Sequence, residues 1–172
     1  MAPKVECYIL HRESPNADAL LYETLFTLDD QDYENLEVKV IENGCSVPRL
    51  HWSRKIHLRE NLGVAKGYNV GLGAESSPYV LLLNNDVAVG VEMVSRLVAF
   101  GKADDSIGIV CPRIYYYGTN SIWYDGGLVN SWTGVARHAN IRQRAKIGPV
   151  SNKARETDRA SSRPLITPNE SP

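Results

Sequence analysis

The 172-residue chain lacks the features that mark several classes of protein. Its longest apolar run, Tyr79 to Leu83, has five residues, whereas a membrane-spanning helix needs about 20. Charged residues follow directly after the first three residues, so no secretory signal is predicted. Cys7, Cys45 and Cys111 lie far apart and form no CxxC motif. A disulfide framework or zinc knuckle is therefore not expected, and a reduced cytoplasmic compartment is predicted.

Charge is unevenly distributed, although the net charge is only -1. Residues 1–110 carry a net charge of -6 and residues 111–172 carry +5. A basic C-terminal part indicates either a nucleic-acid or anionic-membrane partner, or a solvated and poorly ordered terminus. Residues 151–172 are rich in Ser, Arg and Pro and contain little that could be buried, which favours the second interpretation. We therefore expect a folded domain over residues 1–140 and a basic, disordered tail over residues 141–172.

Strand-like and helix-like segments alternate along the folded part. Short apolar or alternating segments predict strands at residues 5–10, 36–41, 56–58, 79–83 and 107–111. The segments 79–83 and 107–111 are continuously apolar, as in strands buried on both faces. Helices between the strands are predicted from apolar residues at helical spacing: Ala17, Leu20, Leu21, Leu25 and Leu28; Ala65, Tyr68 and Leu72; Val91, Val94, Leu97 and Val98. This alternation predicts an α/β fold with a mostly parallel sheet flanked by helices.

The pattern is weaker after Cys111. Residues 115–117 and 122–124 are aromatic-rich and predict two short strands joined by a Gly-Thr-Asn turn. These aromatic side chains either stack on a sugar or base, or simply pack at sheet edges, and the second interpretation is favoured.

Polar clusters follow three of the predicted strands, at residues 11–13, 42–44 and 84–86. In parallel α/β sheets, ligands bind beyond the carboxyl ends of the strands. Asn84-Asn85-Asp86 follows a buried strand and places one carboxylate, Asp86, where it can face a ligand. A single carboxylate with water and phosphate oxygens suits Mg²⁺ or Mn²⁺. An ordinary strand-ending turn explains the same residues equally well.

A glycine-rich segment between residues 61 and 71 is the second candidate site. Glycine there lets backbone N–H groups approach an anion at a helix N-terminus, and Lys66 would add positive charge near a diphosphate. The alternative is that the glycines pack the helix tightly on the sheet. The segment is neither a Walker loop nor a dinucleotide-binding fingerprint.

Other candidates are weaker. Cys45 near His51 and His57 suggests a thiol nucleophile, but no spacing supports one, and a packed or exposed free thiol is favoured. His11 and His138 are single histidines, which are more often structural or solvated than catalytic.

Taken together, these segments resemble family 2 glycosyltransferases, especially the rhamnosyltransferase-like branch. The resemblance covers roughly residues 4–138 and rests on the order and spacing of four motifs: Glu42-Asn43-Gly44; Asn61-x-Gly63-x-x-x-Gly67-x-Asn69-x-Gly71; Leu82-Leu83-Asn84-Asn85-Asp86; and Gly108-Ile109-Val110-Cys111-Pro112. The joint pattern is far more specific than any single motif.

The resemblance implies a GT-A fold, a nucleotide-diphospho-sugar donor, Mg²⁺ or Mn²⁺ and an inverting transfer. Asp86 would face the metal and the diphosphate, and Asn84 the ribose. The donor-binding residues it implies are His11, Glu13, Glu42, Asn43, Asn61, Gly63, Lys66, Asn69, Asn84, Asn85 and Asp86. The acceptor would be a glycan or a lipid-linked sugar, as in polysaccharide biosynthesis, with no nucleic-acid partner. A cytoplasmic location follows, with peripheral association at the inner face of the membrane allowed.

Two departures from the family pattern matter. Glu42 is one methylene longer than the usual Asp at its position. The family also continues into an acceptor half with a Glu-Asp motif that supplies the general base, and Glu156-Thr157-Asp158 resembles only the entry to it. Asp125 and Asp158 are the two carboxylates that could replace this general base, but an ordinary loop position is the favoured interpretation of each. The sequence therefore predicts a glycosyltransferase, with a truncated donor-binding module that lacks transferase activity as the alternative.

Overall fold

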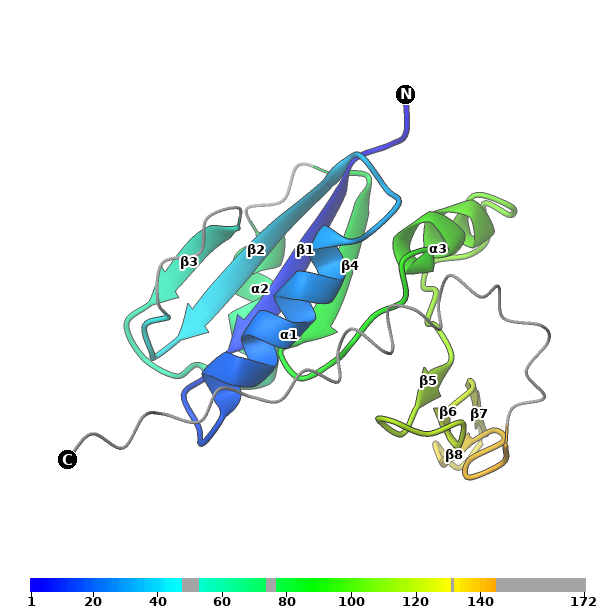
Figure 1. Ribbon diagram of the computed structural model, residues 1–172. Helices are drawn as coiled ribbons and strands as arrows, with labels where there is room; N and C mark the ends of the chain where they lie inside the picture. Colours follow the sequence, from blue (N-terminus) through cyan, green and yellow to red (C-terminus); the bar gives the residue numbers. More distant parts are fainter. Residues whose placement is uncertain (48–52, 74–76, 131, 145–172) are drawn as a thin grey trace. The chain divides into compact units, whose positions relative to one another are not determined.

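The computed structural model describes residues 1–47, 53–73, 77–130 and 132–144 (Figure 1). The chain forms two compact units, Met1–Pro112 and Arg113–Pro172. Within the described residues, no helix is both long and apolar enough to cross a bilayer. Residues 145–172, which make up most of the predicted tail and include Asp158, lie outside the described residues.

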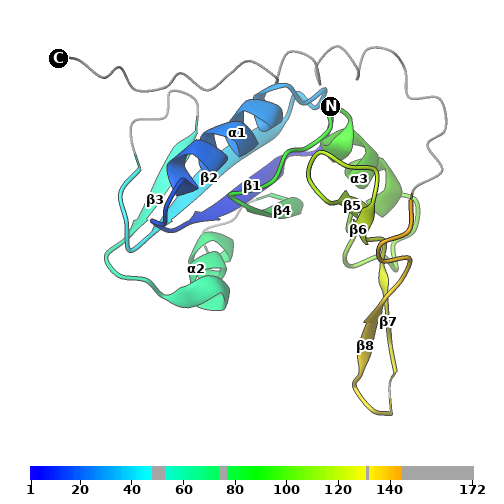
Figure 2. The ribbon, with the colours of Figure 1, turned by 60° about the horizontal axis from the view of Figure 1, so that its bottom comes forward.

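The first unit is built on a four-stranded sheet whose strands are all parallel, in the order β3-β2-β1-β4. Helix α1 covers one face of this sheet and α2 the other (Figure 2). This arrangement confirms the expected α/β fold with a parallel sheet. The elements of this unit are β1 (Val5–His11), α1 (Ala17–Asp29), β2 (Leu36–Asn43), β3 (Arg54–Leu58), α2 (Gly63–Leu72), β4 (Tyr79–Asn84) and α3 (Met93–Gly101).

The described part of the second unit contains two small antiparallel strand pairs. Strands β5 (Ile114–Tyr115) and β6 (Ile122–Tyr124) form one pair, and β7 (Gly127–Val129) and β8 (Ala136–His138) form the other. The aromatic-rich hairpin predicted at residues 115–124 is therefore present, with its first strand shifted toward the N-terminus by one residue.

The main hydrophobic core lies between α1 and the sheet. Alternate residues of β1 and β2, including Cys7, Ile9, Val38 and Val40, face the helix and are buried against its leucines. This follows from the period of two in a strand, which places every second side chain on the same face. The expected inward position of Leu20 is wrong: Leu20 is exposed, and Thr24 occupies the inner stripe instead.

Helix α2 packs on the opposite face through two glycines. A Cβ added to Gly67 would lie 2.6 Å from Leu10 Cδ1, and one added to Gly71 would lie 2.6 Å from Tyr8 Cδ1. The buried residues of this helix are Gly67 and Gly71, whereas Ala65 is exposed, so the expected inward position of Ala65 is wrong. Close packing of helix on sheet is therefore the role of these two glycines.

A charged network occupies the α2 face of the sheet near the start of the strands. The Glu6 carboxylate is 1% exposed and accepts hydrogen bonds from Lys4 Nζ at 2.7 Å and Tyr8 Oη at 2.7 Å. Lys39 Nζ lies 2.9 Å from Oε2, the oxygen that also accepts from Tyr8, whereas Lys4 donates to Oε1. Burial raises the pKa of Glu6, but the three donors outweigh burial and lower it to about 2. Glu6 is therefore a buried carboxylate held in its charged form.

Two predicted buried strands differ from the structure. Strand β4 pairs with β1 only, so it is the edge strand of the described sheet, and Leu82 is 46% exposed. Residues 107–111 form no strand, and Ile109 is 91% exposed. An apolar run is buried only where neighbouring elements cover it. In β4 one face is covered, because Leu81 and Leu83 pack against the core, whereas Leu82 faces the other way and is exposed. Within residues 107–111, Ile109 is exposed and Val110 is half-buried.

We expect Gly71→Ala to lower the free energy of unfolding by about 1–2 kcal/mol. The added methyl would overlap the fully buried Tyr8 ring, and overpacking of this kind costs more than the roughly 1 kcal/mol that alanine gains in helix propensity. Gly90→Ala is the matched control, because a Cβ there meets nothing within 4 Å. Urea unfolding measures both. Equal stability of the two variants would contradict the close packing at Gly71.

We expect the stability contributed by Glu6 to be lost in acid. Its pKa falls from 4.5 to about 2 on folding, so its contribution is complete above about pH 4.5 and disappears as the pH falls toward 2. The contribution is up to about 3 kcal/mol. Unfolding measured from pH 7 to pH 2.5 should therefore show the stability gap between wild type and Glu6→Gln narrowing in acid.

Glu92→Gln is the control for this measurement, because Glu92 belongs to an exposed pair with Arg96 and exposed pairs contribute little. A constant gap between wild type and Glu6→Gln across this pH range would show that Glu6 is not held charged.

Candidate functional site

The parallel strands bring the predicted polar clusters to one edge of the sheet. His11 is in register with Glu42, Glu42 with His57, and Leu10 with Asn84. The residues after β1, β2 and β4 therefore lie at the same carboxyl edge, as expected from the sequence. We call this the strand-end edge.

The Asn43 side chain ties the end of β2 to the start of α2. Its Oδ1 accepts a hydrogen bond from the Leu62 N–H at 2.8 Å, and its Nδ2 donates to Asn61 Oδ1 at 2.9 Å. Asn61 Oδ1 also accepts from the Gly63 N–H at 2.9 Å. Both ends of the Asn43 carboxamide are thus engaged with the loop that begins α2.

Gly44 permits this close approach. Its φ is +73°, in the region that favours glycine, and an added Cβ would lie 2.5 Å from the backbone nitrogen of Asn61. Any other residue would push the loop before α2 away from β2. The Glu-Asn-Gly sequence, predicted to end a strand and to contribute Glu42 and Asn43 to donor binding, therefore also brings the two segments together.

Glu42 is buried and fully engaged. One carboxylate oxygen accepts from the Val47 N–H at 2.9 Å and lies 3.2 Å from Lys55 Nζ, and the other lies 3.1 Å from His57 Nδ1. Burial raises the pKa of Glu42, but these partners outweigh it and lower the pKa below its usual value. Sequence reasoning missed Lys55 and His57 as its partners. The signal available was their alternation on β3, which places both on the same face as Glu42.

His11 is also buried at this edge, with 1% of its surface exposed. Its Nε2 lies 3.1 Å from Asp18 Oδ1 on α1, and its Nδ1 lies 3.0 Å from Asn85 Nδ2 after β4. Its backbone carbonyl accepts a hydrogen bond from the Cys45 thiol at 3.4 Å. His11 therefore connects the end of β1 with α1 and with the segments that follow β2 and β4. Its neighbour Glu13, also predicted at the site, is exposed.

The Asn84-Asn85-Asp86 turn presents its outer side chains to solvent. Asn84 and Asp86 are exposed, and Asn85 is half-buried. The strand before it is held by Tyr68 Oη, which donates to the Leu83 carbonyl at 2.8 Å. The chain after it is held on α1, where Thr24 Oγ1 accepts from the Val87 N–H at 3.1 Å. The turn is thus a fixed loop with an exposed carboxylate.

The start of α2 contributes a second exposed group. Gly63 has a φ of +74° and begins the helix, and Lys66 and Asn69 are exposed on it. Helix N-termini attract anions, and a lysine in the first turn adds charge. Among the described residues, no group of three or more His, Cys, Asp or Glu is arranged to hold a metal ion.

The weaker sequence candidates receive no support as catalytic groups. Burial raises the pKa of the Cys45 thiol, the opposite of what a thiolate nucleophile needs. Asp125 accepts hydrogen bonds from Arg113 Nε at 2.6 Å and Asn140 Nδ2 at 2.9 Å, which hold its pKa below its usual range. His51 and Asp158 lie outside the described residues.

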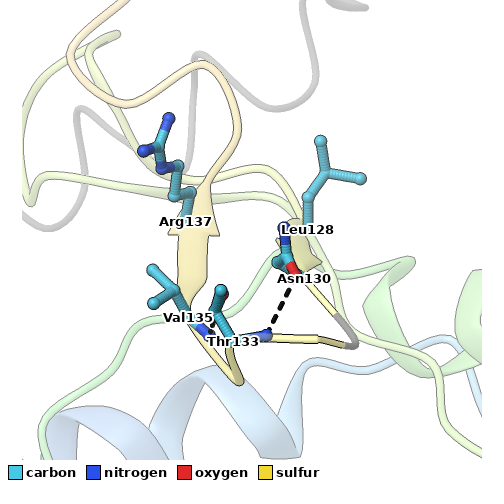
Figure 3. A pocket seen from close by; sticks show the side chains of 5 residues that line it. All are labelled: Leu128, Asn130, Thr133, Val135 and Arg137. Atoms are coloured by element: carbon cyan, nitrogen blue, oxygen red, sulfur yellow. Dashed lines mark hydrogen bonds between the residues drawn. The ribbon is translucent and has the colours of Figure 1, made fainter.

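One face of the β7–β8 hairpin in the second unit is shallowly hollowed (Figure 3). Leu128 and Arg137 are directly opposite each other in the hairpin, so their side chains share a face. Asn130 Oδ1 accepts a hydrogen bond from the Thr133 N–H at 3.0 Å and closes the end of the hairpin. The hollow is lined by Leu128, Asn130, Thr133, Val135 and Arg137, none of which was predicted as a site residue.

Comparison with solved structures identifies the fold. S. aureus TarS 1-349 matches with a TM-score of 0.51 and 20% identity, over 69% of this chain and 41% of that one. The mannosyltransferase PcManGT from Pyrobaculum calidifontis, solved with GDP-Man and Mn²⁺, matches with a TM-score of 0.53 and 21% identity, over 63% of this chain and 34% of that one. The fold is accordingly GT-A-like.

Sequence comparison agrees. An uncharacterized glycosyltransferase of Haemophilus influenzae is 28% identical over an alignment of 102 residues, and the match covers 54% of this chain and 32% of the relative. This chain thus spans about a third of the length of that curated relative. The model of the family described as glycosyl transferase family 2 matches residues 14–154. The chain belongs to glycosyl transferase family 2.

Proposed function

We propose that the strand-end edge binds the nucleoside diphosphate of a nucleotide-sugar donor, and that the chain serves the transfer of that sugar. The observation that carries the proposal is the exposed Asn84-Asn85-Asp86 turn, fixed beside the start of α2 at the edge where parallel sheets bind ligands. Family membership supports it. So do the structural relatives solved with UDP-GlcNAc and with GDP-Man and Mn²⁺.

The donor set fits Mg²⁺ or Mn²⁺. Asp86 is an exposed carboxylate beside the exposed amide of Asn84, so it offers hard oxygen ligands with room for water and phosphate oxygens. A metal held there would neutralise the charge that develops on the departing nucleoside diphosphate. Lys66 and Asn69 on α2 would contact the diphosphate side of the donor, and Asn84 the ribose.

Buried polar residues of the same edge would shape the site rather than contact the donor. Asn43 and Asn61 hold the start of α2, and Gly63 begins that helix. Glu42 holds the loop after β2 through Val47 and the end of β3 through His57. The sequence predicted that these residues contact the donor. We propose instead that they support donor binding indirectly, by fixing the backbone around the site.

The finer features of the proposal are an inverting transfer, rhamnose as the sugar, and a glycan or lipid-linked acceptor at the inner face of the membrane. They rest on the likeness of the sequence motifs to the rhamnosyltransferase-like branch. The second candidate function is a donor-binding module without transferase activity. The observation that favours it is Asp125, which is fixed in an ion pair with Arg113 and so is poorly suited to take a proton from an acceptor.

Calorimetric titration with UDP, GDP and dTDP, each with and without Mn²⁺, tests the donor site. We expect Asp86→Asn to reduce Mn²⁺-dependent affinity at least tenfold while leaving the thermal unfolding midpoint unchanged. The amide keeps the shape of the side chain and removes the charge that a divalent cation needs. Asp105→Asn, which removes an exposed carboxylate elsewhere in the same unit, is the matched control. Unchanged Mn²⁺-dependent affinity in Asp86→Asn would exclude Asp86 as a ligand.

We expect the 172-residue chain to bind a nucleoside diphosphate but to transfer sugar at no more than the rate of donor hydrolysis. A positioned general base contributes about 10²–10⁴-fold to such a reaction, and Asp125 is not available as one. The assay is product formation from labelled UDP-, GDP- and dTDP-sugars with free and lipid-linked glycan acceptors. Robust turnover would refute this prediction and would make Asp125→Asn the next variant to test.

A further inference from the structure

His11 is the last residue of β1, which lies between β2 and β4 at the strand-end edge. The ring is almost fully buried and joins two segments distant in sequence: its Nε2 lies 3.1 Å from Asp18 Oδ1, and its Nδ1 lies 3.0 Å from Asn85 Nδ2. An amide N–H must donate, so Nδ1 accepts and the proton is on Nε2, facing the carboxylate. These two partners select one tautomer of the ring and engage both nitrogens.

With both ring nitrogens engaged, the His11 side chain has no polar atom left to contact a nucleotide-sugar. A residue that contacts a nucleotide must expose a polar group toward it, and this ring is 1% exposed. Its action on a ligand at the Asn84-Asn85-Asp86 turn would pass through Asn85, whose neighbours in the chain are the two exposed residues Asn84 and Asp86.

The other contacts around this turn hold the chain on either side of it. Tyr68 holds the Leu83 carbonyl before the turn, and Thr24 and Thr27 hold Val87 and Val89 after it. Among the described residues, the side-chain contact of the middle residue of the turn, Asn85, is with His11. It would therefore set the direction in which the Asp86 carboxylate leaves the sheet.

We propose that His11 is a positioning residue for the metal and diphosphate site, and that it acts by accepting a hydrogen bond from Asn85 at Nδ1. Its contact with Asp18 fixes the ring and its tautomer. This inference rests on the proposed donor site, and it assigns to His11 an indirect role in place of the direct donor contact expected from the sequence.

Two substitutions of His11 test the roles of its two ring nitrogens separately. In His11→Asn, the side-chain Oδ1 stands near the position of Nδ1 and can still accept from Asn85, while the contact with Asp18 is lost. In His11→Gln, the longer amide can still donate to Asp18, while the acceptor for Asn85 is lost. Asp18 is more than half exposed, so water replaces its lost partner at little cost.

The experiment measures calorimetric affinity for UDP and for GDP in the presence of Mn²⁺. We expect His11→Gln to bind about fivefold more weakly than wild type, the effect of one hydrogen bond, and His11→Asn to stay within about twofold. In an Asn85→Ala background, His11→Gln should have no further effect, because the two residues act as one pair. Equal losses in His11→Asn and His11→Gln, or an undiminished loss in the Asn85→Ala background, would overturn the proposal.

A ligand-free measurement keeps this inference separate from the proposed function. In ¹H–¹⁵N spectra of the free protein, His11→Gln should shift the Asn85 side-chain amide and the backbone amides of Asn84 and Asp86 much more than His11→Asn does. Asn85→Ala should likewise shift the ring Nδ1 resonance of His11, so the pair is tested even if His11→Gln fails to fold. If wild type binds neither nucleotide but these shifts occur, the donor site is wrong and the pair stands. If nucleotides bind and the shifts are absent, the pair is wrong and the donor site stands.

Discussion

The Asn43 carboxamide is the interaction on which the strand-end edge depends. It joins the end of β2 to the loop that begins α2 by two hydrogen bonds shorter than 3 Å, to Asn61 and to the Leu62 N–H. The approach is feasible because Gly44 has a positive φ and no Cβ to strike the Asn61 backbone. This contact fixes the loop before α2 to the end of β2, and so it places the helix N-terminus beside the ends of the strands.

The same helix is held along its length by a steric constraint. Gly67 and Gly71 lie one helical turn apart and let α2 rest on Leu10 and Tyr8 at a distance that no larger residue permits. Tyr8 is in turn held by Glu6, whose charge is stabilised by lysines on the same face of the sheet. The position of the start of α2 therefore depends on packing and charge at the opposite end of the strands. This dependence explains why a helix poor in large apolar residues has a defined place.

The sequence allows the strands and the edge to be predicted, because both follow from local pattern. Val38 and Val40 alternate with charged residues and so predict the buried face of β2, and polar residues mark where strands end. The errors arise where burial depends on a distant partner. Ala65 was expected to face the sheet because a hydrophobic pattern is built from apolar side chains and does not count glycine, whereas Gly67 and Gly71 are the buried residues of this helix. Residues 107–111 were expected to be buried because their composition is typical of a strand. The sequence shows that Lys55 and His57 alternate on one strand, but the register that places them beside Glu42 is a property of the folded sheet.

Burial divides the polar residues of the edge into two groups that composition does not distinguish. Asn43, Glu42 and His11 are buried, and their polar atoms are engaged with the protein. Asn84, Asp86 and Lys66 are exposed beside them. Burying a polar group costs free energy unless it is hydrogen-bonded, so the first group must be saturated by its surroundings and cannot serve a ligand as well. Recognition of a charged ligand then falls to the exposed group, and the buried group determines its geometry. The polar residues that the sequence predicts as one binding motif therefore form a buried framework and an exposed contact surface. Substitutions in the framework should change ligand affinity by altering the geometry of the site, and substitutions in the contact surface should change it by removing contacts with the ligand.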